Sequence, residues 1–219
     1  MKLLARDKLI RTGPVDYADW NYRPVLGSIQ RLRFSLALSL LPKRSTRLLE
    51  IGYGSGVFMP ALASIATEVY GIDPHEKTAD VLSAFEDTGI RPKLFQAPAE
   101  ALPFDNDMFD GVVAVSSLEF VSDLDKTCGE IKRVLKPTGV FVVVTPGHSP
   151  VLDFGLKILT GNSAKRDFGG RRQAIIPTLL NHFVLDRRRT APPLGGSLFS
   201  LYSALRLKKP ATAGQDQSR

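Results

Sequence analysis

The chain has 219 residues with a net charge of +7, and 43% of its residues are hydrophobic, which suits one globular domain with extensions and excludes a wholly disordered chain. Its one cysteine, Cys128, excludes an internal disulfide and a cysteine-based metal cluster, and His75, His148 and His182 lack the spacing of zinc ligands. Apolar runs stay well short of the roughly 18 residues that span a bilayer, and the charged N-terminus does not resemble a signal peptide, so we expect a cytoplasmic protein without a metal.

The first 41 residues have the pattern of amphipathic helices, with Tyr17, Trp20 and Tyr22 near a stretch punctuated by glycine and proline. This segment precedes the first predicted strand. We therefore expect residues 1–41 to form a helical N-terminal lid over the edge of a sheet.

The middle of the chain alternates between short apolar runs and helical patterns. Strands are predicted at 46–51, 68–72, 93–96, 109–116 and 140–145, and helices at 57–65, 78–87 and 124–135. This alternation is typical of a mostly parallel sheet that helices cover on both faces.

The last third predicts one or two helices in an insertion at 147–181, then strands at 182–189 and 198–207 joined by a proline and glycine turn. Two consecutive strands with a short link pair antiparallel. The expected fold is thus α/β: a Rossmann-like, doubly wound, mostly parallel seven-stranded sheet with a C-terminal antiparallel hairpin. It would occupy residues 42–207, with its core at 46–146 and a disordered tail at 208–219.

A glycine-rich turn follows the first predicted strand, in residues 48–56 (LLEIGYGSG). Gly52, Gly54 and Gly56 would let the backbone turn sharply and approach a ligand. Asp73 comes 21 residues after Gly52, at the end of the second strand, where a carboxylate can accept hydrogen bonds from a ribose. These features predict a ligand that contains adenosine.

A dinucleotide is disfavoured, because Val57 stands where the third glycine of the dinucleotide fingerprint belongs. Glu50 beside the loop would repel a pyrophosphate. The same carboxylate suits a cationic ligand that carries an ammonium and a sulfonium group. A nicotinamide-dependent oxidoreductase therefore stays a weaker alternative.

Five motifs occur in order: LLEIGYGSG (48–56), VYGIDP (69–74), AEALPF (99–104), FDGVVAVSSLEFV (109–121) and EIKRVLKPTG (130–139). Together they resemble class I S-adenosylmethionine (SAM)-dependent methyltransferases of the type 11 methyltransferase domain, similar to ubiquinone/menaquinone C-methyltransferases. The resemblance implies SAM as cofactor and S-adenosylhomocysteine as product. The cofactor-binding residues that it implies are Glu50, Gly52, Tyr53, Gly54, Gly56, Asp73, Pro74, Ala99, Glu100 and Ser116.

The chain departs from the family pattern at Pro98, where an acidic residue is usual, and at Phe120, where a histidine is usual. The contact to the adenine amino group would then fall to the backbone or to Gln96. These two departures keep open a second hypothesis, a non-catalytic SAM-fold binding or scaffold protein.

The resemblance implies methyl transfer to an oxygen, nitrogen or carbon atom of a small-molecule acceptor, catalysed mainly by positioning. The sequence does not identify a catalytic base; the candidates are Glu119, His148, Tyr17 and Tyr22. An acidic middle lies between two basic flanks, which favours a lipophilic or anionic acceptor or peripheral contact with a membrane. Nucleic acid is not favoured, since the chain has no RNA-binding motif, and the sequence says nothing about oligomeric state.

Overall fold

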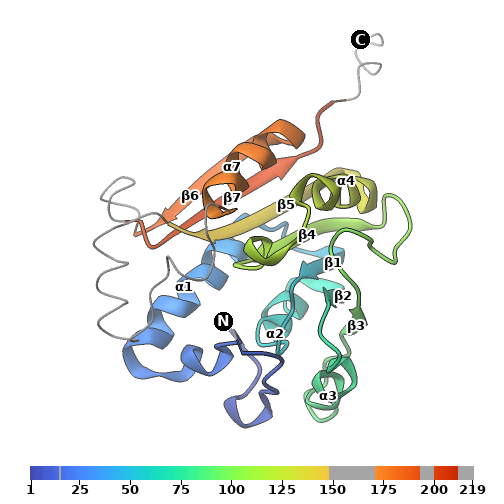
Figure 1. Cartoon of the computed structure of the whole chain (residues 1–219). Helices are drawn as coiled ribbons and strands as arrows, with labels where there is room; N and C mark the ends of the chain where they lie inside the picture. Colours follow the sequence, from blue (N-terminus) through green and yellow to red (C-terminus); the bar gives the residue numbers. More distant parts are fainter. Residues whose placement is uncertain (15, 148–170, 193–199, 212–219) are drawn as a thin grey trace.

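A computed structural model of the chain describes residues 1–14, 16–147, 171–192 and 200–211 (Figure 1). Seven strands form one sheet in the order β3-β2-β1-β4-β5-β7-β6. Neighbours from β3 to β5 are parallel, and β7 is antiparallel to both β5 and β6. The doubly wound sheet and its antiparallel C-terminal hairpin are thereby confirmed. The strands are β1 (Ser45–Ile51), β2 (Ala66–Asp73), β3 (Lys93–Gln96), β4 (Phe109–Val115), β5 (Leu135–Pro146), β6 (Val184–Ala191) and β7 (Tyr202–Lys208).

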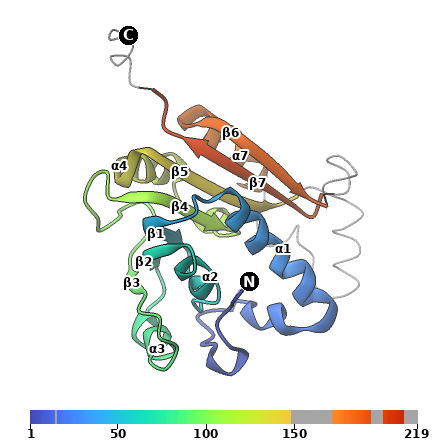
Figure 2. The ribbon, with the colours of Figure 1, turned by 180° about the vertical axis from the view of Figure 1, so that it is seen from behind.

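Helices cover both faces of this sheet (Figures 1 and 2). The helices are α1 (Pro24–Leu40), α2 (Met59–Ala63), α3 (Thr78–Ser83), α4 (Leu124–Val134) and α7 (Arg171–His182), with short 3-10 turns η1 (Arg6–Lys8), η2 (Ala18–Tyr22) and η3 (Leu118–Phe120). Side chains from α1, α2 and α3 enter one buried cluster, and those from α4 and α7 enter another. Alternate strand residues serve the two clusters: Leu48 lies in the first and Leu49 in the second.

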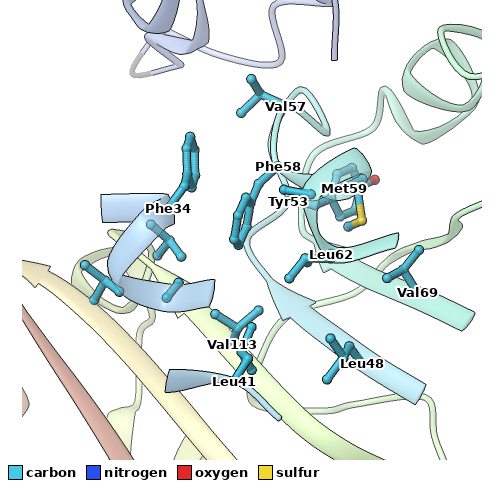
Figure 3. Close-up of a cluster of buried hydrophobic side chains, with 14 of the residues drawn as sticks. Phe34, Leu41, Leu48, Tyr53, Val57, Phe58, Met59, Leu62, Val69 and Val113 are labelled. Carbon is cyan, nitrogen blue, oxygen red and sulfur yellow. The ribbon is translucent and has the colours of Figure 1, made fainter. Parts of the chain in front are cut away.

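The first cluster fixes α1 on the sheet. Figure 3 shows the Phe34 ring of α1 facing Phe58, and their ring centroids are 4.5 Å apart in a stacked arrangement. Leu48 of β1 and Val113 of β4 lie beneath them, both fully buried. Removing such apolar area from water is the main stabilising term for this helix. The same packing determines which face of α1 is turned toward the ends of β1 and β4.

Three sequence-based expectations need correction. The described residues among 1–22 contain only the turns η1 and η2, and one long helix begins at Pro24, because Gly13 and Pro14 interrupt any earlier helix. Strand β5 begins at Leu135, five residues earlier than expected, since Leu135 pairs with Phe109 before a shift in register. His182 ends α7 and does not start a strand.

Other expectations fall partly outside the described residues. Of the predicted insertion at 147–181, the structure describes Gly147 and α7, and of the tail at 208–219 it describes residues 208–211. None of the described helices is long and apolar enough to cross a membrane.

Two partly buried hydrogen-bond networks stabilise the sheet and the loop at residues 102–104. The Asp110 carboxylate accepts hydrogen bonds from the backbone N–H groups of Thr46 (2.7 Å) and Arg47 (2.8 Å), which joins β4 to the start of β1. The Arg133 guanidinium donates to the carbonyl oxygens of Leu102 (3.0 Å) and Phe104 (2.6 Å). These motif residues are therefore architectural.

Candidate functional site

A cavity of about 500 Å³ lies where the strand order reverses, between the C-terminal ends of β1 and β4. In open α/β sheets this switch point is where ligands bind, and the volume falls within the range of about 300–1,000 Å³ that is usual for small-molecule sites. The walls come from the loop after β1, the end of β2, residues 98–100, the end of β4, helix α1 and the N-terminal segment.

The loop after β1 takes its shape from glycine. Gly52, Gly54 and Gly56 have φ angles of +77°, +50° and +71°, a region that other residues rarely adopt. A Cβ on Gly52 would lie 2.5 Å from the Cβ of Ser117, and one on Gly56 would lie 2.9 Å from the Phe85 ring. Gly52 and Gly54 line the cavity, whereas Gly56 is not among the lining residues and serves the packing behind the loop.

Asp73, at the end of β2, fixes this loop and lines the cavity. Its Oδ2 accepts a hydrogen bond from the Gly54 N–H (2.9 Å), and its Oδ1 accepts one from the His75 N–H (3.3 Å). Each carboxylate oxygen can accept more than one hydrogen bond. Asp73 can therefore hold the loop and still accept hydrogen bonds from ligand hydroxyls.

His75 is a site residue that the sequence analysis did not single out. Its Nδ1 accepts a hydrogen bond from the Lys77 N–H (3.1 Å), so its Nε2 carries the proton and donates to the Gly54 carbonyl oxygen (3.0 Å). Both ring nitrogens are thus engaged in holding the loop. The contact between His75 and the Lys77 N–H spans two residues and depends on the turn after β2. The sequence alone does not show this turn, so it could not identify His75.

Glu50, near the end of β1, is 3% exposed and lines the cavity. Burial raises the pKa of its carboxyl to about 8; the nearby Asp73 carboxylate adds to the rise, and the Arg33 guanidinium opposes it. The Oε2 atom is buried, and no described part of the chain supplies it with a hydrogen-bond partner. A buried carboxyl in this state favours a ligand that brings a positive charge or a hydrogen-bond donor.

The raised pKa of Glu50 predicts a pH-dependent stability. The unfolded chain loses this proton near pH 4.5, while the folded chain holds it to about pH 8. Between these values the free energy of unfolding of the wild type should fall, relative to that of Glu50→Gln, by about 1.4 kcal/mol per pH unit at most. Denaturant titrations from pH 4 to pH 9 measure this difference, and parallel profiles for the two proteins would contradict the assignment.

Arg33 is the second residue that the sequence analysis missed. It reaches the cavity from α1, and its Nε is buried without a hydrogen-bond partner. Burial lowers the pKa of this guanidinium, against the charges of Tyr202, Glu50, Glu119 and Asp16, and an arginine remains charged in this state. One signal could have found it: Gln30 and Arg33 share a helix face with the buried Ala37.

Four buried polar atoms around this one cavity have no hydrogen-bond partner among the described residues: Arg33 Nε, Glu50 Oε2, Ser55 Oγ and Ser116 Oγ. Buried polar groups in proteins are nearly always paired, so such a group of atoms marks a place where a ligand can supply the partners. Ser116, the residue after β4, also has a left-handed φ of +54° that turns the chain at the cavity wall.

The remaining expected cofactor residues lie as follows. Pro74, Ala99 and Glu100 line the cavity, as does Pro98. The Glu100 Oε1 accepts hydrogen bonds from the N–H groups of residues 122 (2.6 Å) and 123 (3.1 Å), so this carboxylate also fixes the loop after η3. Gln96 does not line the cavity; its amide donates to the Pro74 carbonyl oxygen (3.4 Å).

Tyr53 lines the cavity and is 2% exposed. Its hydroxyl pairs with the Thr78 Oγ1 (2.8 Å), and burial raises the pKa of this hydroxyl to about 12. Its ring stands edge-on to His75 at 4.9 Å. Tyr53 is therefore a neutral wall of the site.

The structure does not bring the candidate catalytic residues together at the cavity; of the described ones, Tyr17 alone lines it. Tyr22 is not among the lining residues, and its hydroxyl donates to the Leu4 carbonyl oxygen, which fastens the N-terminal segment. Glu119 is 3% exposed and also does not line the cavity, although its charge acts on Arg33. His148 lies outside the described residues. Tyr17 does line the cavity, with Trp20, and their ring centroids are 4.4 Å apart.

The electrostatics of the cavity favour a cation. Among the described residues, four carboxyl side chains and one guanidinium line it: Asp16, Glu50, Asp73, Glu100 and Arg33. Over the same part of the chain, no group of three or more histidine, cysteine, aspartate or glutamate side chains is placed to hold a metal ion. The site suits an organic ligand with ribose hydroxyls, a positive charge and a group that can meet Arg33.

Comparison with known proteins shows similarity to methyltransferases, over the part of the chain that forms most of this cavity. Residues 49–143 match the family model described as a methyltransferase domain. Over 119 residues the chain is 32% identical to the sterol 4-C-methyltransferase strm-1 of Caenorhabditis elegans, which covers 53% of this chain and 36% of that protein. Over 130 residues it is 33% identical to a demethylmenaquinone methyltransferase of Thermus thermophilus, with 58% of each chain covered.

The fold is shared with solved structures. One is the N-methyltransferase NodS from Bradyrhizobium japonicum in complex with S-adenosylhomocysteine, with a TM-score of 0.62 and 16% identity over 90% of this chain and 94% of that one. The chain spans only between a third and three fifths of the two curated relatives named above. Residues 49–143 of this chain are therefore similar to the methyltransferase domain family, and the shared fold extends over most of the chain.

Proposed function

We propose that the chain is a SAM-dependent methyltransferase that acts on a small-molecule acceptor. The observation that carries the proposal is the set of unpartnered polar atoms around one acidic cavity, beside an aspartate fixed by the glycine loop. This donor set matches a cofactor with a ribose, an ammonium, a carboxylate and a sulfonium. The matched methyltransferase domain supports the same reading.

Asp73 would accept hydrogen bonds from the ribose hydroxyls, and the backbone of Gly52 and Gly54 would lie against the ligand without side chains between them. Glu50 and Arg33 would face the charged methionine end. Ala99 and Pro98 would form the apolar side of the adenine pocket.

Bound SAM supplies a methyl group on a positive sulfur; the new bond forms from an acceptor lone pair as the carbon–sulfur bond breaks, with its electrons, toward sulfur. The chain contributes orientation and exclusion of water, since Tyr17 and Trp20 lie at the wall of the cavity. Two of the described titratable groups there are already engaged in hydrogen bonds within the protein: His75 uses both nitrogens, and Asp16 accepts hydrogen bonds from Thr12 and Ala18. This arrangement supports catalysis by positioning.

The acceptor is proposed to be lipophilic or anionic. Phe120, 48% exposed, joins the aromatic wall and gives the cavity an apolar rim. Several relatives act on apolar molecules, by their names a sterol and a demethylated menaquinone. A cytoplasmic location and peripheral contact with a membrane remain predictions, the latter supported by the three exposed arginines of β6, residues 187–189.

The test is production of S-adenosylhomocysteine from SAM with a panel of phenols, amines and demethylated quinols, using the wild type and Asp73→Asn. Turnover of one acceptor class by the wild type, with a large loss in the variant, would support the proposal. Tight cofactor binding without turnover of any acceptor would favour the non-catalytic binding protein. Absence of cofactor binding by folded protein would refute both.

A further inference from the structure

A second cavity, of about 390 Å³, lies under the N-terminal segment. Its lining includes the side chains of Arg6, Arg11 and Arg23 together with the apolar Leu9 and Ile10. We name these five residues the basic groove. The segment that carries it is held in place, because the Leu4 N–H donates to the Val57 carbonyl oxygen (3.1 Å) and the Lys77 ammonium donates to the Arg11 carbonyl oxygen (2.9 Å).

The basic groove and the cofactor cavity share a wall. Four residues line both cavities: Asp16, Tyr17, Ala18 and Trp20. Figure 1 shows this part of the chain, in dark blue, beside the first turns of α1. A molecule whose reactive end lies in the cofactor cavity can therefore reach the basic groove by passing the Tyr17 and Trp20 rings.

The two cavities have opposite electrostatic character. Four carboxyl groups and one guanidinium line the cofactor cavity, whereas the three guanidinium groups of the basic groove and two carboxylates line the second cavity. Of those two carboxylates, Asp16 already accepts hydrogen bonds from the Thr12 N–H and Oγ1 (3.0 Å each), and Asp19 lies 3.4 Å from the Arg23 guanidinium. With three guanidinium groups against two carboxylates, the second cavity has an excess of positive charge.

Arginine groups are suited to carboxylate and phosphate, which they bind through paired N–H donors. Arg11 donates from Nε to the Gly13 carbonyl oxygen (3.2 Å) and from Nη2 to that of Pro14 (3.3 Å), which fixes the orientation of its guanidinium. The Arg23 guanidinium lies over the Trp20 ring, 5.8 Å from its centroid. Leu9 and Ile10 are only partly buried and offer apolar area beside the charges.

We propose that the basic groove binds an anionic group, a phosphate or a carboxylate, carried on the apolar body of the acceptor. This inference rests on the proposed function and names the class of its substrate: an amphiphilic anion. The nucleophilic end lies in the acidic cavity, the apolar body lies along Tyr17, Trp20, Leu9 and Ile10, and the anion meets the arginines. The charge difference between the cavities orients the acceptor.

Trp20 is the only tryptophan in the chain, so intrinsic fluorescence reports on this wall alone. The probe is octyl phosphate, titrated below its micelle concentration. Octyl glucoside, inorganic phosphate, and vesicles of phosphatidylcholine with phosphatidylglycerol form the comparison arms. Calorimetry with S-adenosylhomocysteine on the same samples tests the cofactor cavity separately.

The double variant Arg6→Gln/Arg23→Gln removes two charges from the groove and leaves Arg11 to hold its loop. The control is Arg188→Gln, an exposed arginine on β6. We expect saturable fluorescence change with octyl phosphate, weakened about tenfold or more in the double variant and unchanged in the control. Only the concentration dependence is compared, because Arg23 lies over the reporting ring. Retained S-adenosylhomocysteine binding shows that the variants are folded.

Four results would overturn the inference: an equal response to octyl glucoside, an equally strong response to inorganic phosphate alone, the same loss in Arg188→Gln, or a response to anionic vesicles without one to octyl phosphate. The last result would make the groove a membrane contact. Octyl phosphate binding without S-adenosylhomocysteine binding would refute the proposed cofactor while the groove stands. The reverse would refute the groove alone.

Discussion

Replacement of Asp73 by alanine is expected to weaken binding of S-adenosylhomocysteine about a hundredfold, because two hydrogen bonds to a charged acceptor contribute about 1.5 kcal/mol or more each. The substitution also removes the acceptor of the Gly54 N–H, so the loop after β1 loses its anchor. Calorimetric titration with SAM and S-adenosylhomocysteine measures the loss, and NAD⁺ serves as a ligand that should not bind.

Asp73→Asn separates these two effects. The amide oxygen can still accept from the Gly54 N–H, so the loop is kept while the charge is lost, and we expect a weaker effect of about tenfold. Glu76→Gln, an exposed carboxylate three residues further on, is the matched control and should bind as the wild type does. Equal affinity in wild type and Asp73→Ala would remove Asp73 from the site.

Gly52→Ala is expected to destabilise the fold by about 2–4 kcal/mol and to abolish cofactor binding. The substitution forces an alanine into a φ of +77° and places its Cβ 2.5 Å from that of Ser117. Ser117 cannot easily move aside, because its hydroxyl donates to the Ile51 carbonyl oxygen at 2.6 Å. Thermal unfolding and calorimetry measure the two losses.

The chain provides a matched control for backbone strain. Gly89 has a φ of +74°, and a Cβ there would meet nothing within 4 Å. Gly89→Ala should therefore show the left-handed strain alone, about 1 kcal/mol, with cofactor affinity unchanged. If both variants lost the same stability, the contact with Ser117 would have no part in the effect at Gly52.

The type of sheet and the glycine loop could be predicted because their signals are local: short apolar runs that alternate with helices, and a glycine-rich turn directly after a strand. The pairing of Gly54 with Asp73 follows from the same logic, since parallel neighbours such as β1 and β2 end at one edge. The roles of the loop glycines and Asp73 are therefore indicated by the few residues around them.

The interaction of Arg33 with Glu50 and the position of the basic groove have no comparable local signal in the sequence, although helical spacing places Arg33 on the face of Ala37. Arg33 reaches Glu50 only because Phe34 and its neighbours pack α1 across the sheet, which is a tertiary effect. The prediction of helices before residue 24 was wrong for a related reason. The apolar residues of this segment pack on the core from irregular backbone and short turns, as the fully buried Leu4 does. Glu119 is the opposite case. Its place in a motif made it a candidate base, but its side chain is buried and does not line the cavity.

Strand β7 lies between β5 and β6, although it is the last of the seven along the chain. During synthesis on the ribosome, the apolar edge of β5 therefore emerges long before its partner exists, and β6 has no strand to pair with until residues 202–208 follow. An open apolar edge is a template for pairing with other chains. A truncation that removes these seven residues would thus expose an aggregation-prone edge at the centre of the sheet, so fusions and shortened forms of this protein should be designed to retain Lys208.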